Sequence, residues 1–567
     1  MRDKISLRWA LFSTLFLINL IPRFLAARYS IIHDCDEVYN YWEPLHYILH
    51  DYGFQTWEYS GEYCIRSWFY ILLHSIIMIV PKSLGFKRIT EFFFIRFVFA
   101  ILCALSETKL CLSIIGVLGK DIGFFYFLFT ITSVGMFNAS TAFLPSTFTM
   151  YTSMLGLSAF FESALSKRTI EIIFWFFLGG IVGWPFSLIL AIPIISYEFL
   201  ISIYNIPLKQ VFLKYLKAIF VCIIILAFVC LVDSLAYRKF QIVPLNIIKY
   251  NVLSGKGKGP EIFGVEPWWF YFLNLLLNFN VVFILCFLSL PIMFSYFSRF
   301  SLNIAKKGFL LSIISPFYLW FFIFTIQPHK EERFFFAIYP FICLNASIAI
   351  SQSLSLIKSY NNFRYISCIV RYIYVFISTS VLVISFLRVL LIIDAYSAHM
   401  SVYTKIPSAS NNFRSILCIG KEWHRFPSSF FVPDNISVKF IKSRFTGLLP
   451  GEFISNKDEW RSGMWLIPSN MNDLNMEEWE KYTDISQCDY LVDTDFFARY
   501  SFENSTEDII EPRYVKNEEM WKKIFCMNFL DASSTRIYSR ILWMPSKFSR
   551  RIYGDYCLLK RKKFHKL

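Results

Sequence analysis

The stretch VFLKYLKAIFVCIIILAFVCLVD, residues 211–233, decides the class of this protein. Its residues are almost all apolar, and a helix of about 20 such residues crosses the hydrocarbon core of a membrane. Ten further apolar stretches are found at 7–27, 64–80, 92–118, 121–135, 141–165, 170–199, 268–297, 308–327, 333–357 and 369–394. The sequence therefore predicts an all-α multispanning membrane protein with about eleven crossings. We expect 92–118, which contains Glu107 and Lys109, or the short 121–135 to be a paired or re-entrant segment.

The composition agrees with a membrane protein and excludes several other classes. Apolar residues make up 56% of the 567 residues, and only 17% are charged, against roughly 25% in a soluble domain. The 13 Cys, 21 Gly and 21 Pro are too few for a small disulfide scaffold, a disordered chain or a collagen-like repeat. The net charge of +15 is typical of Lys and Arg flanking membrane spans, so we expect no nucleic-acid partner.

Charge also divides the chain near residue 400. Residues 1–400 carry 31 basic and 20 acidic side chains, which is 51 charges in 400 positions. Residues 401–567 carry 25 and 21, which is 46 in 167, a density that is normal for a water-soluble domain. We therefore expect a membrane-spanning catalytic region at 1–400 and a smaller soluble domain with a basic tail at 401–567.

The soluble part has the pattern of a small α/β domain. Short alternating runs at Ser415–Gly420, 438–441 and 489–493 predict strands, and the stretches Asn475–Tyr482 and 518–525 predict helices. Glycine fingerprints of Rossmann or P-loop type do not occur in the sequence.

Charges at the N-terminus set the expected topology. Arg2, Lys4 and Arg8 precede the first span and favour a cytosolic start, which puts the loop 28–63 on the other side. Eleven crossings would put 401–567 on that side too, and the sequons at Asn435 and Asn504 agree with a luminal domain. The basic tail favours the cytosol instead, so the side of the C-terminus stays open.

The loop 28–63 concentrates groups that can transfer protons. Asp34, Asp36, Glu37 and Glu43 lie near His33, among aromatic residues such as Trp42 that favour the membrane interface and can stack on sugar faces. A carboxylate between walls of low dielectric constant has a raised pKa and can accept a proton from a hydroxyl. The cluster is therefore a candidate general base, and the alternative is a solvated acidic loop without catalytic function.

A second polar cluster, Gln327-Pro-His329-Lys330-Glu331-Glu332-Arg333, interrupts the most apolar half of the chain. His329, Lys330 and Arg333 can donate charge-assisted hydrogen bonds to a lipid phosphate at interface depth. The alternative is an ordinary loop whose Glu and Arg side chains pair with one another.

Three further features are open to a structural explanation. Arg66 is either a substrate contact or the partner of Glu58 or Glu62. Cys35 and Cys64 bracket the first loop and can form a disulfide in an oxidising compartment, although the pairing of 13 cysteines is not readable. Neither a CxxC nor an HExxH pattern occurs, so we expect no metal site, with assistance by a divalent ion left open.

Several motifs together resemble one enzyme family. They include HDCDEVYNYWEPLHYILHDYGFQTWEYS (33–60), AFLPSTFTMYT (142–152), EPWWFYFLN (266–274), QPHKEERF (327–334) and GKEWHRFPSSFFVPDN (420–435). The chain resembles the dolichyl-phosphate-mannose-dependent α-1,2-mannosyltransferases of glycosyltransferase family 22 in the endoplasmic reticulum. Within that family it is most similar to the branch that adds mannose twice to the lipid-linked oligosaccharide. The resemblance covers both parts of the chain.

The resemblance implies a GT-C fold with a luminal active site in the membrane of the endoplasmic reticulum. It implies inverting transfer of mannose from dolichyl phosphate mannose to a mannose 2-hydroxyl on a lipid-linked oligosaccharide, without a cofactor. The family's HxxDE-type signature falls on His33, Asp36 and Glu37. It makes Asp36 the expected base, with Glu37 and Asp34 as rivals.

The remaining assignments concern binding. His33, Trp42, Glu43 and Arg66 are expected to contact substrate, and His329, Lys330 and Arg333 to stabilise the departing phosphate.

Other functions fit parts of the sequence. A sibling enzyme acting on a glycolipid anchor or forming an α-1,6 bond is the alternative within the enzyme class. A secondary transporter would place ionisable groups at mid-membrane and often contain inverted repeats, whereas the charges here gather at the ends of spans. A non-catalytic membrane scaffold would tolerate loss of the acidic loop.

Overall fold

The computed structural model describes residues 2–163, 167–254, 259–360, 364–408, 414–456, 458–496 and 511–562. The chain forms two compact units. Unit 1 comprises Met1–Arg28, Arg96–Ser234 and Ile242–Phe386, and unit 2 comprises Tyr29–Ile95, Leu235–Gln241 and Leu387–Leu567. The loop 28–63 therefore folds with the C-terminal soluble part, a grouping that the change in charge density near residue 400 does not reveal.

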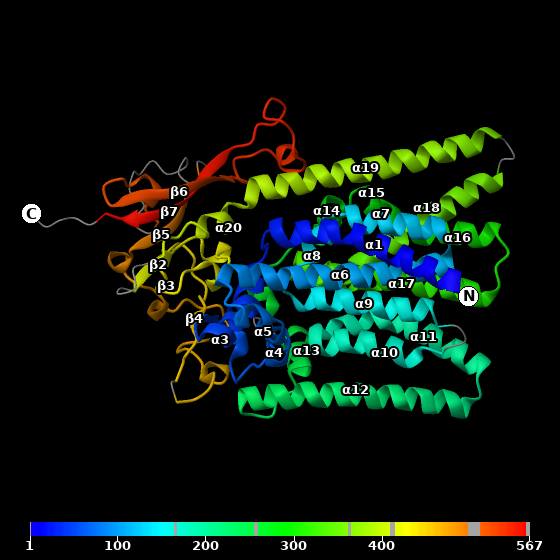
Figure 1. Cartoon of the computed structure of the whole chain (residues 1–567), viewed down its shortest axis with the longest axis horizontal. Coiled ribbons are helices and arrows are strands. Elements are labelled where there is room, and N and C mark those ends of the chain that lie inside the picture. The colour runs from blue at the N-terminus through cyan, green and yellow to red at the C-terminus, as the bar shows by residue number, and fades with distance from the viewer. Residues whose placement is uncertain are drawn as a thin grey trace, which may run out of the picture. The chain divides into compact units, whose positions relative to one another are not determined.

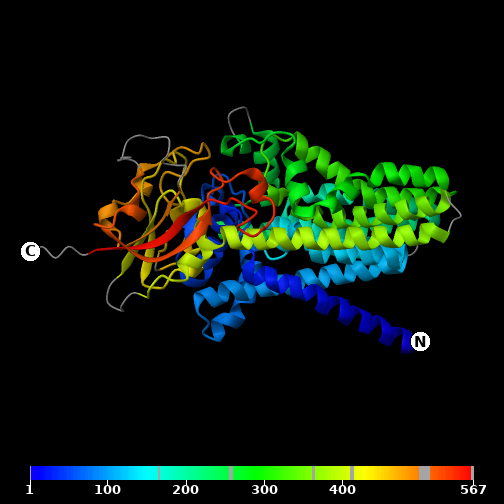
Figure 2. The same ribbon diagram turned by 90° about the horizontal axis from the view of Figure 1, so that it is seen from above.

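Unit 1 is a bundle of apolar helices that run side by side (Figure 1), and α1 lies at one edge of it when seen from above (Figure 2). Helices suit this composition because lipid offers no hydrogen bonds, so each segment must satisfy its own backbone groups. The helices that lie wholly or mostly in this unit are α1 (Arg2–Tyr29), α6 (Arg88–Leu118), α7 (Lys120–Thr132), α8 (Val134–Ala139), α9 (Pro145–Phe161), α10 (Thr169–Leu178), α11 (Leu188–Asn205), α12 (Leu208–Tyr237), α13 (Val243–Leu253), α14 (Phe270–Phe279), α15 (Val281–Phe287), α16 (Ser289–Arg299), α17 (Ile304–Ile326), α18 (Tyr339–Tyr360) and α19 (Arg364–Tyr396).

Fewer helices reach spanning length than the eleven apolar stretches suggest. Among the described residues, 7 helices are long and apolar enough to cross a membrane, or up to 8 if the bent pair Val281–Phe287 and Ser289–Arg299 is one span. The stretches at 64–80, 121–135 and 141–165 fold as shorter helices of at most 17 residues. At 1.5 Å per residue such helices are shorter than the ~30 Å hydrocarbon core. The multispanning helical class is confirmed, but the structure does not support eleven full-length spans.

Glu107, the acidic residue inside 92–118, is paired, which is one of the two alternatives predicted for this segment. Arg23 of α1 donates to both oxygens of Glu107 in α6, over 3.0 Å from Nε and 2.7 Å from Nη2, and both side chains are fully buried. Arg23 also donates to the Thr130 carbonyl oxygen over 2.6 Å. A charge in a helix buried at this depth needs such a partner, because an isolated ion is costly to remove from water. The stretch 92–118 is therefore part of one continuous helix.

Unit 2 combines short helices with two sheets, which confirms the smaller α/β domain. Its helices are α2 (Cys35–Glu37), α3 (Glu43–His50), α4 (Trp68–Ser75), α5 (Ile79–Ser83) and α20 (Ala398–Tyr403). Its strands are β1 (Phe54–Gln55), β2 (Ser415–Ile419), β3 (Ile436–Phe440), β4 (Gly451–Glu452), β5 (Tyr490–Asp495), β6 (Trp521–Leu530) and β7 (Tyr553–Arg561). The larger sheet has the order β3-β2-β5-β7-β6, and β3, β2 and β5 are parallel to one another. The carboxyl ends of these three strands therefore meet at one edge of the sheet.

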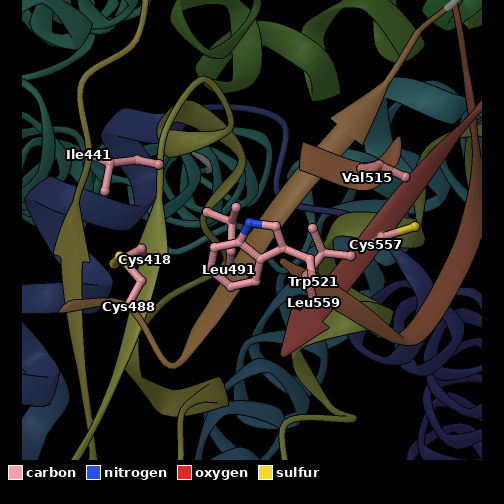
Figure 3. Close-up of a cluster of buried hydrophobic side chains, with 8 residues drawn as sticks. All are labelled: Cys418, Ile441, Cys488, Leu491, Val515, Trp521, Cys557 and Leu559. Atoms are coloured by element: carbon pink, nitrogen blue, oxygen red, sulfur yellow. A yellow bond between two sulfur atoms is a disulfide. The ribbon is translucent and has the colours of Figure 1, made fainter. Parts of the chain in front are cut away.

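A buried cluster with two disulfides holds this sheet together (Figure 3). Cys418 of β2 is bonded to Cys488, which lies just before β5, and Cys526 of β6 is bonded to Cys557 of β7. Trp521 and Leu491 fill the space between them. The bridge suggested between Cys35 and Cys64 is not formed, because Cys64 is a buried thiol that donates to the Ser60 carbonyl oxygen.

Two of the local predictions in this unit are wrong. Residues 518–525 do not form a helix, because Trp521 begins strand β6 and the strand pairs with β7 along its length. The expected helix from Asn475 to Tyr482 is a single 3-10 turn at Trp479–Lys481. Asn475 has a φ of 53°, a left-handed conformation that interrupts a helix. At 518–525, pairing with β7 outweighs the local preference of charged residues for helix.

Candidate active site

The acidic motif of the first loop folds into three consecutive helical turns. Asp34 has an extended backbone and caps α2, since its carboxylate accepts a hydrogen bond from the Asp36 backbone N–H over 2.8 Å. A five-residue π-helical turn, Val38–Trp42, follows and leads directly into α3. Turns of this kind are rare and occur frequently at functional sites. The sequence Asp-Cys-Asp-Glu thus encodes a helix start that fixes its own carboxylates.

The three candidate bases differ in accessibility. Glu37 is buried, and its carboxylate accepts a hydrogen bond from the Trp42 indole N–H over 3.0 Å. Asp34 is half-buried and uses one oxygen for the helix cap. The Asp36 side chain is 35% exposed, and its Oδ2 lies 3.8 Å from Arg66 Nη2. Asp36 therefore keeps surface available to a substrate, whereas Glu37 is buried and one oxygen of Asp34 is used by the helix cap.

Arg66 is held by a dense set of acceptors. It donates to both oxygens of Glu58 over 2.8 Å each and to the Tyr41 hydroxyl over 2.8 Å. Burial disfavours the charged guanidinium, but Glu58, Tyr41 and Asp36 outweigh burial and raise the pKa of Arg66. The pairing with Glu58 that the sequence left open is formed. Arg66 therefore stays charged beside Asp36, and its position depends on Glu58.

Glu43 is fully buried and faces protein donors on every side. Its Oε1 accepts from the Ser428 hydroxyl over 2.8 Å and from the Ser429 N–H over 2.7 Å. Its Oε2 accepts from the Ser429 hydroxyl over 2.8 Å and from the Phe54 N–H over 3.0 Å. Gly53 is needed beside it, because a Cβ there would come within 2.6 Å of the Glu43 carbonyl oxygen. The geometry gives Glu43 a structural position and leaves no surface for a sugar.

Trp42 and His33 occupy opposite environments. Trp42 is fully buried, with its ring 4.2 Å from Phe92 and 5.9 Å from Phe430 between centroids. In this arrangement its faces pack on protein and not on a ligand. His33 is exposed at the start of the motif and is open to substrate. His33 can therefore make the predicted contact with a substrate, whereas the buried Trp42 cannot.

The helix start also gathers the ligand types that a cation takes. Asp34, Cys35 and Asp36 offer one atom each within 4.8 Å of one another. Carboxylate oxygens suit hard divalent cations such as Mg²⁺ and Ca²⁺, but a thiol does not. The expectation that the enzyme needs no metal stays a prediction.

The second cluster lies in unit 1 and is bound to the loop that precedes α14. His329 places Nδ1 2.8 Å from the Gly264 carbonyl oxygen and Nε2 3.1 Å from Glu331 Oε1. Burial opposes protonation of His329, but Glu331 outweighs burial and raises its pKa. Arg333 donates to the other oxygen of Glu331, and Arg333 together with His329 lowers the pKa of Glu331. The cluster thus holds two cationic groups around one carboxylate.

Lys330 has a different position from its neighbours. Its ammonium group is buried and donates to the Glu266 carbonyl oxygen over 2.9 Å and to that of Gln327. Glu266 N–H in turn donates to the Pro328 carbonyl oxygen over 3.0 Å. Lys330 therefore ties two loops together, and its donors are directed at backbone oxygens and not outward.

The tied loop presents apolar side chains to the surroundings. Trp268 is 66% exposed, and Phe263, Val265 and Trp269 are exposed as well. Aromatic residues of this kind are enriched where a protein meets the membrane interface. The cationic cluster is thus adjacent in structure to a surface suited to lipid.

Sequence reasoning missed the serines that bind Glu43. Ser428 and Ser429 lie 385 and 386 residues from it, and spacing along the chain carries no signal for such a contact. The motif GKEWHRFPSSFFVPDN, noted above only as part of a family resemblance, was the available clue.

Two solved structures align with this chain at low sequence identity. ArnT from Cupriavidus metallidurans bound to undecaprenyl phosphate aligns with a TM-score of 0.47 at 10% identity, over 78% of this chain and 86% of ArnT. The archaeal oligosaccharyltransferase AglB from Archaeoglobus fulgidus, in complex with an inhibitory peptide and a dolichol-phosphate, aligns with a TM-score of 0.38 at 12% identity, over 76% of this chain and 65% of AglB.

Sequence relatives match nearly the whole chain. The chain is 40% identical over 556 residues to Alpha-1,2-mannosyltransferase alg9 of Schizosaccharomyces pombe, covering 96% of this chain and 94% of the relative. It is 37% identical over 571 residues to Alpha-1,2-mannosyltransferase ALG9 of Homo sapiens, covering 97% and 89%. It is 32% identical over 583 residues to Alpha-1,2-mannosyltransferase ALG9 of Saccharomyces cerevisiae, covering 97% and 98%. A model of the family matches residues 14–433, and the chain belongs to the Alg9-like mannosyltransferase family.

Proposed function

We propose that this protein transfers mannose from dolichyl phosphate mannose to the 2-hydroxyl of a mannose on a dolichyl-diphosphate-linked oligosaccharide. The relatives that cover nearly the whole chain carry the name α-1,2-mannosyltransferase, which supports the reaction type. The GT-C architecture and the place in N-glycan precursor assembly that the family resemblance implies are part of the proposal.

Asp36 is the general base of this proposal. Its carboxylate takes the proton of the acceptor 2-hydroxyl as the hydroxyl oxygen forms a bond to C1 of the donor mannose. The bond from C1 to the phosphate oxygen breaks, and its electron pair leaves with the dolichyl phosphate. Attack opposite the leaving group inverts C1. Arg66 Nη2 lies 3.8 Å from Asp36 Oδ2 and orients this carboxylate before the transfer. A positioned base contributes about 10²–10⁴-fold to the rate.

His329 and Arg333 stabilise the negative charge that develops on the leaving phosphate. Glu331 holds both side chains and favours the protonated form of His329, whose pKa it raises against burial. Arg333 lies at the start of the candidate span Glu332–Ser359 and His329 precedes it, whereas a transporter would place such groups at mid-membrane. Lys330 contributes indirectly in this proposal, since its ammonium group is engaged by backbone carbonyl oxygens.

Both substrates reach the enzyme along the bilayer. The exposed Phe263, Val265, Trp268 and Trp269 provide an apolar surface next to the cationic cluster, where a polyprenyl chain can lie while its phosphate meets His329. Lipid-linked donors and acceptors need such a site at the membrane interface, and a soluble nucleotide sugar would not.

We place unit 2, which carries Asp36, in the lumen of the endoplasmic reticulum. Two disulfides in the sheet support an oxidising compartment. Of the two sequons that suggested this side, Asn435 lies just before β3, and its carbonyl oxygen accepts from Ser415 N–H over 3.0 Å. Asn504 and the last residues of the basic tail lie outside the described residues.

The accessibility of Asp36, beside a buried Glu37 and a capping Asp34, is the observation that carries the proposal. The test is mannose transfer from dolichyl phosphate mannose to the truncated lipid-linked oligosaccharide by the purified chain. We expect Asp36→Ala to lower kcat at least 100-fold, on the scale of a lost general base. Glu62→Ala removes an exposed carboxylate of the same loop and should leave the rate unchanged.

Two results would redirect or reject this proposal. Near-normal turnover of a correctly inserted Asp36→Ala would move the base to Asp34 or Glu37. No transfer by the wild-type chain onto this acceptor, with transfer onto a glycolipid anchor precursor, would favour the sibling enzyme. Digestion of the product with an α-1,2-specific mannosidase separates the α-1,2 from the α-1,6 linkage.

A further inference from the structure

A small pocket opens where the parallel strands of unit 2 end. Its lining comes from the segments that follow β2 and β3, from β5 and from residues 511–514, and it is a shallow depression whose space of about 240 Å³ includes open solvent. Ile441 and Leu491, labelled in Figure 3, form its apolar wall and also belong to the disulfide cluster. Ligands of open α/β sheets bind outside the carboxyl ends of the strands, which is where this pocket lies.

Asp493 gives the pocket an unsatisfied acceptor. Its side chain is 5% exposed, and Oδ1 lies 3.1 Å from the ammonium nitrogen of Lys421. Oδ2 is buried without a hydrogen-bond partner among the described residues. Burial raises the pKa of Asp493 to about 6, even though Lys421 opposes this shift. A buried carboxylate oxygen without a donor is costly, and a ligand hydroxyl would satisfy it.

The neighbouring buried carboxylate, Glu422, differs from Asp493 because both of its oxygens are satisfied. Glu422 accepts from Arg425 over 2.7 Å and from the Thr494 hydroxyl over 2.6 Å, so each of its oxygens has a partner. Glu422 and Thr494 therefore form a fully hydrogen-bonded pair next to the pair Lys421 and Asp493, in which Asp493 Oδ2 has no partner among the described residues.

The charges of the lining favour a neutral ligand. Lys421 and Lys442 supply two positive charges, and Asp493 and Glu511 supply two negative charges. Two carboxylates would repel a phosphate, and two ammonium groups would repel a metal cation. A polyhydroxyl compound matches the pocket better, because each hydroxyl both donates, to Asp493, and accepts, from Lys421.

An exposed indole adjoins the rim. The ammonium nitrogen of Lys442 lies 5.1 Å from the ring centroid of Trp479 and 5.2 Å from that of Tyr482. Trp479 is 69% exposed, which is unusual for so large an apolar side chain in a polar segment. A flat, exposed ring beside hydrogen-bonding groups can pack against the apolar face of a sugar.

The pocket belongs to the same unit as the acidic first loop, and Tyr39 connects the two. Tyr39, three residues after Asp36, donates from its hydroxyl to the carbonyl oxygen of Trp423 over 2.8 Å. Trp423 lies two residues after Lys421. A branched oligosaccharide engaged at the first loop therefore has a second candidate contact within the same unit.

We propose that this pocket binds a hexose of the lipid-linked oligosaccharide other than the one that reacts, through Asp493, Lys421 and the face of Trp479. The inference rests on the proposed function and adds a second acceptor-binding site to it. Such a site would let the enzyme recognise the architecture of its acceptor as well as the terminal mannose.

The test compares two variants in the purified full-length enzyme. Asp493→Asn keeps the shape of the side chain but removes the charged acceptor, and Trp479→Ala removes an exposed ring without opening the core. We expect the acceptor KM to rise about tenfold for Asp493→Asn, which corresponds to ~1.4 kcal/mol, and about threefold for Trp479→Ala. The kcat and the KM for the donor should stay within twofold of wild type. Asp555→Asn, an exposed position on β7, is the matched control.

Binding is measured separately from turnover. Saturation-transfer NMR with α-1,2-linked mannobiose should show less transfer to the sugar for both variants than for wild type, and inorganic phosphate should not compete. Competition by phosphate would make the pocket an anion site and overturn the proposal. An unchanged acceptor KM for folded Asp493→Asn, or for Trp479→Ala if the first variant does not fold, would also overturn it. A wild-type chain that binds mannobiose but transfers no mannose would refute the proposed function and not this inference.

Discussion

Replacing Glu43 distinguishes a structural carboxylate from a substrate ligand. The sequence places Glu43 among the substrate contacts, whereas the structure surrounds it with four donors from Phe54, Ser428 and Ser429. Glu43→Ala would remove the acceptor for all four donors at once. Two of them are backbone N–H groups that cannot turn toward water. We therefore expect a loss of stability rather than a selective loss of acceptor binding.

The size of this loss follows from the contacts. A buried donor without an acceptor costs about 1–3 kcal/mol. Four losses at one residue are not additive, and breaking a buried charged network by removing one partner costs about 3–5 kcal/mol. In a domain of 150–250 residues, 1 kcal/mol lowers Tm by about 2–4 °C. We therefore expect Glu43→Ala to lower the Tm of unit 2 by roughly 10 °C, and Glu43→Gln to lower it less, because the amide oxygen still accepts.

The assay is thermal unfolding of the detergent-solubilised enzyme, followed by kinetics at a temperature where the variant is folded. Glu62→Ala, in the same loop but exposed, should leave Tm unchanged. A Glu43→Ala enzyme with wild-type Tm and a greatly raised acceptor KM would refute the structural assignment. That result would restore Glu43 as a substrate contact.

Other perturbations test separate parts of the fold and mechanism. The pKa of His329 is raised above its ordinary value of 6.5. The positive charge of His329 is therefore present at lower pH and is lost as the pH rises through the raised pKa. We expect kcat/KM for the donor to fall as the pH rises through the pKa of His329 in wild type. The same dependence of kcat/KM on pH in His329→Asn would contradict this prediction. Replacing Cys418 by Ser opens a disulfide that spans 70 residues and should cost about 4 kcal/mol, measured as a lower Tm, which a reductant should reproduce in wild type. Arg23→Gln should lower the free energy of unfolding by about 3–5 kcal/mol, because it leaves Glu107 buried without its partner. The double variant Arg23→Met with Glu107→Leu should be closer to neutral. Equal losses of Tm for the single and the double variant would argue against a buried ion pair.

The sequence was most informative where chemistry is local. The acidic motif predicted a cluster of carboxylates, and the structure gathers Asp34, Asp36 and Glu37 on one short helix start. The pairing of Arg66 with Glu58, eight residues apart, was one of the stated alternatives for the same reason. The strands β2, β3 and β5 were also readable, because alternation along a strand is a local pattern.

What the sequence could not supply depends on contacts between distant segments. Tryptophan is a residue type that favours the membrane interface and can stack on sugars. The burial of Trp42 against Phe92 and Phe430, in contrast, results from packing between distant segments. Residues 518–525 resemble a surface helix by charge, and pairing with β7 makes Trp521 the start of a strand. The described residues contain fewer helices of spanning length than the apolar stretches suggest for a related reason. Hydropathy registers apolar runs but does not say where a helix breaks, as at the 52° bend between Val281–Phe287 and Ser289–Arg299.

The two candidate clusters follow one rule once the contacts are known. Motif residues that are buried as well as engaged by protein, such as Glu43 and Lys330, shape a loop, because a substrate cannot reach their hydrogen-bonding groups. Motif residues that keep exposed surface beside an oppositely charged partner, such as Asp36 beside Arg66, can exchange that partner for a substrate. A charged motif in an interfacial loop must contain both kinds, since a catalytic group cannot hold its position unless neighbouring charges fix the backbone that carries it. Equal presence in a sequence motif therefore does not imply an equal role in the reaction.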